Sequence, residues 1–138
     1  MNISVLDGSS YFKGLLLLIR KDNKISKDEH LLLARIGKTL GFEKTFIENA
    51  IQEILNNKYI TSTPPVFSTR ELAEKFLKDG LVLAASDRNI HPHEEAWLSS
   101  VADKNNIEKE WLLTEKKIII EKGRNACQLE ADNLKVIY

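Results

Sequence analysis

The chain contains several stretches in which apolar side chains recur at helical spacing. Within residues 9–21, positions 15–19 are apolar almost all round, which is typical of a helix at the centre of a domain. Over residues 27–40, and again from Glu43 to about Leu55, leucine and isoleucine recur every three or four residues and mark one buried face. This part of the chain is therefore predicted to form three helices.

The same pattern occurs a second time, 65 residues further along. Helices are predicted over about 69–86, over 92–104 and from about Glu108 onward, and residues 76–112 align with 11–47 without a gap. Nine positions are identical in the two copies: Lys13, Leu16, Leu18, Asp22, Ile25, Glu29, Leu33, Glu43 and Lys44 recur as Lys78, Leu81, Leu83, Asp87, Ile90, Glu94, Leu98, Glu108 and Lys109. We therefore predict an all-α fold, a single compact helical bundle of six to seven helices built from two tandem three-helix repeats.

Turn-forming residues divide the chain within this single domain. Residues 56–67 include Asn-Asn, Thr-Ser-Thr and Pro64-Pro65, which cannot continue a helix. After them, Ser68 and Glu71 are predicted to form a capping box that starts the second copy. The expected divisions of the 1–138 domain are repeat one over about 9–57, a linker over about 58–67, repeat two over about 68–122 and a C-terminal tail over 123–138. The tail is either a further short helix packed on the body or a segment that packs on a partner.

Two features predict how the bundle is packed. Gly14 and Gly80 lie inside predicted helices, where glycine is unfavourable, so we expect the two central helices to approach closely there. Trp97 and Trp111 align with apolar residues of the first copy, so we predict both tryptophans in the core.

Each repeat joins its first and second helices through a turn with the pattern Asp-x-x-Ile-x-x-x-Glu. The acidic residues are Asp22 and Glu29 in the first copy and Asp87 and Glu94 in the second. Carboxylates, together with carbonyl groups of the turn, are the hard oxygen ligands that Ca²⁺ or Mg²⁺ prefers, so all four residues are candidate metal ligands. The alternative is structural, because a glutamate in the first turn of a helix caps backbone N–H groups and complements the helix dipole.

The two turns differ in charge. Lys24 and Lys27 lie in and beside the first turn and repel a cation. The second turn offers His91 and His93 as further ligands against a single Arg88, which makes it the better candidate. These histidines also make a transition metal a less favoured alternative to Ca²⁺ or Mg²⁺.

Composition and missing motifs exclude several other classes of function. The chain has 138 residues and is 43% hydrophobic; its 20 basic residues balance 20 acidic ones without a basic stripe, which argues against nucleic-acid binding. Cys127 is the only cysteine, and no apolar run suits a signal peptide or a membrane span, so we expect a cytoplasmic protein without membrane insertion. No nucleophile elbow, phosphate loop or His-Glu-x-x-His motif is present, so we predict that the protein is not an enzyme. A metal-dependent enzyme that uses His91 and His93 is the alternative.

The acidic turn lies between an apolar and a leucine-rich helix and is followed by Leu40-Gly41-Phe42; this arrangement resembles the TerB-like family, named for the bacterial tellurite-resistance protein. A related domain begins a membrane-anchored DnaJ-like co-chaperone. The resemblance spans about residues 9–115 and implies an all-helical bacterial cytoplasmic protein with a role in stress response or as an adaptor. It also implies a metal-associated surface at Asp22, Glu29, Asp87 and Glu94. The family's usual glycine in the turn is replaced by Asn23 and Arg88.

Two functional hypotheses follow. The first is a TerB-like non-enzymatic module that binds a divalent cation through its duplicated acidic turns, in a stress or tellurite-resistance type of response. The second is an adaptor in which the acidic turns are only helix caps. In that case another protein binds the exposed face of the third helices or the tail.

Overall fold

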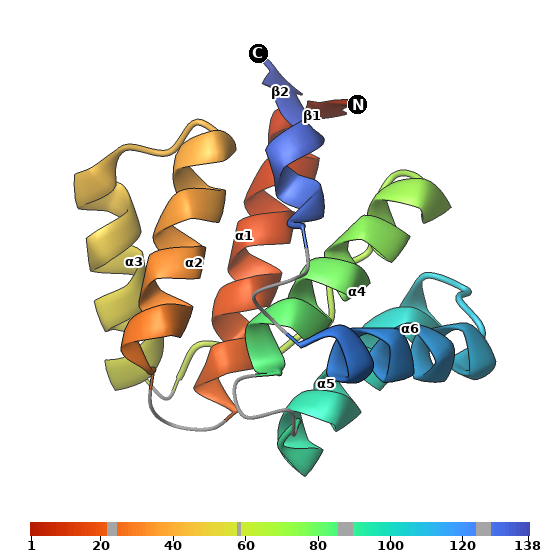
Figure 1. Cartoon of the computed structure of the whole chain (residues 1–138). Helices are drawn as coiled ribbons and strands as arrows, with labels where there is room; N and C mark the ends of the chain where they lie inside the picture. Colours follow the sequence, from red (N-terminus) through yellow and green to blue (C-terminus); the bar gives the residue numbers. More distant parts are fainter. Residues whose placement is uncertain (22–24, 58, 86–89, 124–127) are drawn as a thin grey trace.

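The computed structural model describes residues 1–21, 25–57, 59–85, 90–123 and 128–138. Its elements are, in chain order, β1 (Asn2–Ser4), α1 (Val5–Arg20), α2 (Lys27–Thr39), α3 (Lys44–Asn56), α4 (Arg70–Ala84), α5 (Pro92–Lys104), α6 (Lys109–Lys122), the 3₁₀ helix η2 (Glu130–Asn133) and β2 (Lys135–Ile137). The predicted all-α bundle is confirmed, with a two-stranded sheet added to it (Figure 1). Among the described helices, none is both long and apolar enough to cross a lipid bilayer.

The internal repeat is confirmed in detail. Helices α4, α5 and α6 each begin 65 residues after α1, α2 and α3, respectively. The turn after the second helix is also repeated, because Gly41 and Asn106 occupy equivalent positions and both have positive φ angles, 94° and 58°. Glycine adopts this conformation freely, and asparagine tolerates it better than most other residues. The two copies thus share backbone geometry as well as an apolar pattern.

Two helix starts differ from the expectation. Helix α1 begins at Val5, earlier than residue 9, because the hydroxyl of Ser4 accepts a hydrogen bond from the Asp7 N–H at 3.1 Å. The predicted capping box of Ser68 and Glu71 is wrong: Thr69 is the N-cap of α4 and accepts from the Leu72 N–H. Ser68 instead donates its N–H and its hydroxyl to the carboxylate of Asp7, which joins the start of α4 to α1.

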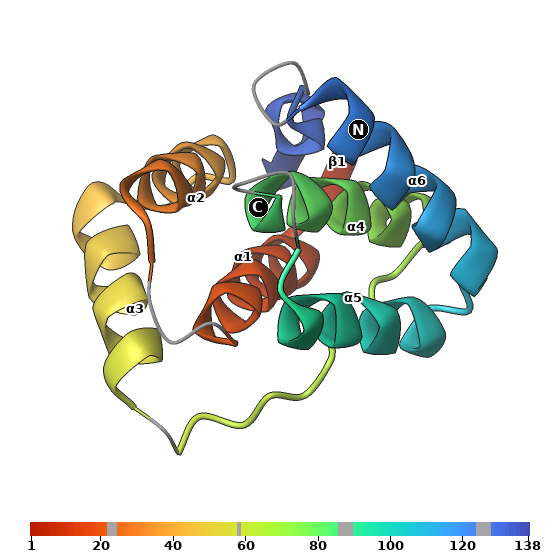
Figure 2. The ribbon, with the colours of Figure 1, turned by 60° about the horizontal axis from the view of Figure 1, so that its bottom comes forward.

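Helices α1 and α4 lie at the centre of the molecule, with α2 and α3 on one side and α5 and α6 on the other (Figure 2). At Gly14 a Cβ atom would lie 2.8 Å from the ring of Phe76 on α4, so the predicted close approach of the central helices is confirmed there. Trp97 is buried, and its Nε1 donates to the Gly14 carbonyl at 3.2 Å. Trp111 is only half-buried and packs at the edge of the core.

The last residues of the linker between the repeats are held by the side chain of Asn105, from the second repeat. Asn105 accepts a hydrogen bond from the Phe67 N–H at 2.9 Å, and its amide nitrogen donates to the Pro65 carbonyl at 2.9 Å and to the Val101 carbonyl at 2.8 Å. Phe67 itself is buried. The end of the linker therefore packs on the second repeat, whereas its middle is joined to the first repeat, because Arg20 of α1 donates to the Ser62 hydroxyl.

The described part of the tail, residues 128–138, packs on the body of the same chain. It forms η2 and then β2, which pairs in parallel with β1 so that Ile3 lies opposite Val136. Of the two alternatives for the tail, packing on the body is the one observed, but as a 3₁₀ turn and a strand instead of an α-helix. The sheet brings the two ends of the described chain together (Figure 1).

Candidate functional site

In the first acidic turn, the structure shows a helix cap. The Ser26 hydroxyl accepts from the Glu29 N–H at 3.1 Å, and Glu29 Oε1 accepts from the Ser26 N–H at 3.0 Å. This is a complete capping box, and Glu29 is buried, with 7% of its surface exposed. One oxygen of the carboxylate is therefore occupied by the start of α2. Asp22, the other predicted ligand of this turn, lies outside the described residues.

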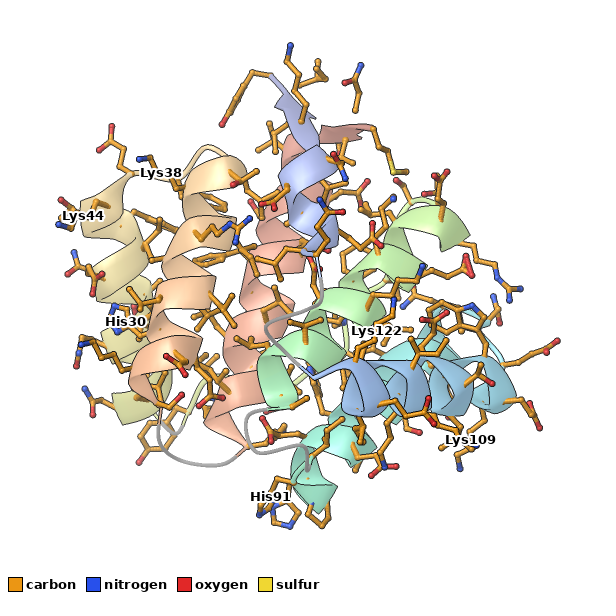
Figure 3. All side chains as sticks on the ribbon, viewed as in Figure 1. His30, Lys38, Lys44, His91, Lys109 and Lys122 are labelled. Atoms are coloured by element: carbon orange, nitrogen blue, oxygen red, sulfur yellow. The ribbon has the colours of Figure 1, made fainter. Side chains whose placement is uncertain are left out.

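In the second acidic turn, Glu94 occupies the equivalent place in the first turn of α5 and is also buried. Pro92 is at the first helical position, as predicted. His91 is the N-cap: its Nδ1 accepts from the His93 N–H at 3.1 Å, and the two rings lie edge to face 4.9 Å apart. Figure 3 shows His91 at the free end of α5, pointing away from the body. Asp87 lies outside the described residues.

A metal site is not assembled from the residues that the structure describes. Among them, no group of three or more histidine, cysteine, aspartate or glutamate side chains is placed to hold a metal ion. Glu29 and Glu94 belong to different repeats and open different helices. Binding of Ca²⁺, Mg²⁺ or a transition metal by Asp22, Glu29, Asp87 and Glu94 stays a prediction, because it depends on two residues outside the described part of the chain.

A cavity of about 360 Å³ lies between α1 and α3, and we call it the α1–α3 groove. Its apolar lining comes from α1, from α3 with the turn before it, and from the linker: Phe12, Leu16, Phe42, Phe46, Ile54 and Ile60. Phe42 lies between the rings of Phe12 and Phe46, at centroid distances of 5.2 and 5.1 Å, and is stacked on the second. The groove thus has a continuous aromatic wall.

Phe46 is the most exposed of the three aromatic side chains in this wall. It follows the apolar period of the third helix, yet 53% of its surface is exposed. Helical spacing identifies a side chain's face but does not say whether another element covers that face. Its counterpart in the second copy, Trp111, is half-buried, and the small Ala50 of the groove is replaced there by Glu115. The helices are therefore repeated in the second copy, but the residues that line the groove are not.

Charged side chains flank the apolar wall. Lys13 from α1 and Glu53 from α3 both line the groove, and neither forms an ion pair with another residue in the described part of the chain. On the other side of α3, His30 pairs with Glu48 at 3.0 Å and joins α2 to α3. The groove therefore presents the positive charge of Lys13 and the negative charge of Glu53 beside its apolar wall.

No protein-family model, curated protein or solved structure matches the chain. The resemblance to TerB-like proteins therefore depends on the repeated turn motif and its place between the helices.

Proposed function

We propose that the chain is a TerB-like, non-enzymatic interaction module that binds another protein through the α1–α3 groove. The observation that carries the proposal is the half-exposed Phe46 ring, stacked on Phe42 beside an apolar cavity. Covering such a ring removes apolar surface from water, and this stabilises the complex by about 25 cal/mol per Å² of buried surface. Aromatic residues beside a pocket are the usual energetic centre of a protein interface. The partner would insert an apolar side chain there.

The capping role of Glu29 supports the same proposal. In an adaptor the acidic turns need only start their helices, and the Ser26–Glu29 box does this completely. The resemblance to the TerB-like family adds the proposal that the interaction serves a stress or tellurite-resistance type of response. Cells that lack the protein should then become more sensitive to tellurite, and a form changed at Phe46 should fail to restore resistance.

The direct test replaces Phe46 and follows one partner. Phe46→Lys should reduce capture of the partner about tenfold or more, while Leu113→Lys, at an exposed position of α6, should leave it within twofold. A photo-crosslinking residue at position 50 should label the same protein. Equal thermal melts of the two variants would exclude a folding defect. Undiminished capture by Phe46→Lys would overturn the proposal.

Cation binding by the second acidic turn is the competing proposal. It is supported by the place of Glu94, a buried carboxylate in the first turn of α5, soon after the segment that includes Asp87. It predicts calorimetric heat with Ca²⁺, Mg²⁺, Mn²⁺ or Zn²⁺ that is lost in Glu94→Gln and retained in the matched variant Glu29→Gln. It also predicts a lower melting temperature in EDTA, because a bound metal stabilises the folded state. The interaction proposal expects neither effect.

A further inference from the structure

A buried carboxylate on α4 binds the main chain of the tail. Asp79 is fully buried, and its Oδ1 accepts from the Glu130 N–H at 2.6 Å. Its Oδ2 accepts from the Ala131 N–H at 2.9 Å and from the Tyr11 hydroxyl at 2.6 Å. Two of these three donors belong to the backbone of the tail. Asp79 therefore recognises a chain conformation, the start of a 3₁₀ turn, independently of the side chains that the turn carries.

The side chains of the tail meet complementary charges. Glu130 lies 3.3 Å from Lys75 Nζ and 3.8 Å from Lys78 Nζ, both on α4. Asp132 pairs with Arg35 on α2. Three basic residues from two helices thus surround two acidic residues of the tail. The apolar residues between and beside these acids are buried: Leu129, Ala131 and Leu134.

Beyond the turn, the tail is held by strand pairing. The Lys135 N–H donates to the Met1 carbonyl at 2.9 Å, and β2 then continues alongside β1. Val136 lies close to the backbone of α1, because a Cβ atom at Gly8 would be 3.0 Å from its Cγ2. Strand addition, buried apolar side chains and opposite charges are the means by which proteins bind peptide segments.

We propose that Arg35, Lys75, Lys78 and Asp79, with the edge of β1, form a peptide-binding surface that residues 128–138 occupy as an intramolecular ligand. The surface accepts from a partner protein an acidic segment of the same chemistry, with two acidic side chains on a helical turn and a β-strand directly after it. We call it the Asp79 surface. It shares no residue with the α1–α3 groove, so the proposal is independent of the function proposed above.

Competition by the chain's own segment sets how tightly a partner binds. A ligand tethered to its site has an effective concentration in the millimolar range. The intact chain therefore binds a free segment much more weakly than a chain whose tail has been detached. Reversing the two charges of the tail detaches it and leaves every residue of the Asp79 surface unchanged.

The first experiment uses a fluorescent peptide of residues 128–138 and the full-length chain. The Glu130→Lys/Asp132→Lys chain should bind this peptide at least tenfold more tightly than the wild-type chain does. A peptide that carries the same two reversals should bind neither chain. Hydrogen exchange at residues 130–135 checks that the tail of the variant is released. A released tail without peptide binding up to about 1 mM would overturn the proposal, as would a tail that stays protected in the variant.

A second experiment needs no variant of the tail. Excess unlabelled peptide is added to the ¹⁵N-labelled wild-type chain, and the amide resonances of residues 130–137 should move to the positions of a released segment. Asp79→Asn should abolish this displacement of the tail by the peptide. The amide group of asparagine would place its own N–H donors opposite one of the two backbone N–H groups that Asp79 accepts. Asp7→Asn is the matched control, since Asp7 is also a buried carboxylate that accepts a backbone N–H, but from Ser68 at the start of α4. Resonances that do not move at saturating peptide would overturn the proposal.

Discussion

At the scale of single residues, Asn105 shows how one amide positions a segment that has no regular structure. Its counterpart in the first copy is Leu40, so Asn105→Leu gives the residue that the repeat itself uses. The substitution leaves the buried Phe67 N–H and the Pro65 carbonyl without their partner. We expect the free energy of unfolding to fall by about 2–4 kcal/mol, as measured by urea denaturation.

The control for this variant is Asn56→Leu, at an exposed position near the end of α3. It should change the stability by less than about 0.5 kcal/mol, as surface substitutions usually do. If Asn105→Leu were as stable as the wild-type chain, the linker would not depend on this amide.

Single residues were also the hardest to place from sequence. Asp79 is conspicuous as the only acidic residue in the second half of α4, and its counterpart is Gly14. Its role was not predictable, because its tail partners lie 51 and 52 residues further along and belong to no periodic element. Phe46 shows the opposite difficulty: it lies on the apolar face of the third helix, but the described residues leave about half of its side chain exposed, and periodicity does not predict this.

At the scale of elements, the helix caps are the local interactions most directly open to measurement. Ser26→Ala removes the hydroxyl that accepts the Glu29 N–H, and we expect it to lower the unfolding free energy by about 1 kcal/mol. Glu29→Gln should cost less, because the side-chain oxygen of glutamine can still accept from the Ser26 N–H. Both values come from denaturant titration. A larger loss in Glu29→Gln than in Ser26→Ala would indicate a role for the Glu29 charge beyond capping.

The elements themselves were largely predictable. Apolar periodicity identified the six α-helices of the described residues. Helix α5 begins and ends at the predicted residues, because proline at its start and polar residues after its end are strong local signals. Strands β1 and β2 have three residues each, too few for an alternating pattern to be recognised. They form because Ile3 and Val136 meet across the sheet, which is a tertiary contact.

At the scale of the whole molecule, Asp79 makes stability depend on pH. Burial raises the pKa of Asp79 from 3.8 to about 6, against the lowering effect of the hydrogen bonds from Tyr11, Glu130 and Ala131. A carboxyl whose pKa is higher in the folded state binds protons more tightly there. Its stabilising contribution is therefore complete below about pH 4 and is lost as the pH rises through 6.

The measurement compares wild type and Asp79→Asn by denaturant unfolding at several pH values. Other carboxyl groups contribute to both proteins and largely cancel in the difference. The unfolding free energy of the wild-type chain, relative to the variant, should decrease by on the order of 2 kcal/mol between pH 4 and pH 7. A difference that stays constant over this range would contradict a raised pKa at Asp79.

The pairing of β1 with β2 joins the two ends of the described chain and so has a consequence for synthesis. Residues 128–138 leave the ribosome after every helix of the bundle, and at 5–20 residues per second their synthesis takes about one second. Until then Arg35, Lys75, Lys78 and Asp79 have no tail to bind. A nascent chain thus passes through a period in which a neighbouring protein meets this surface without competition.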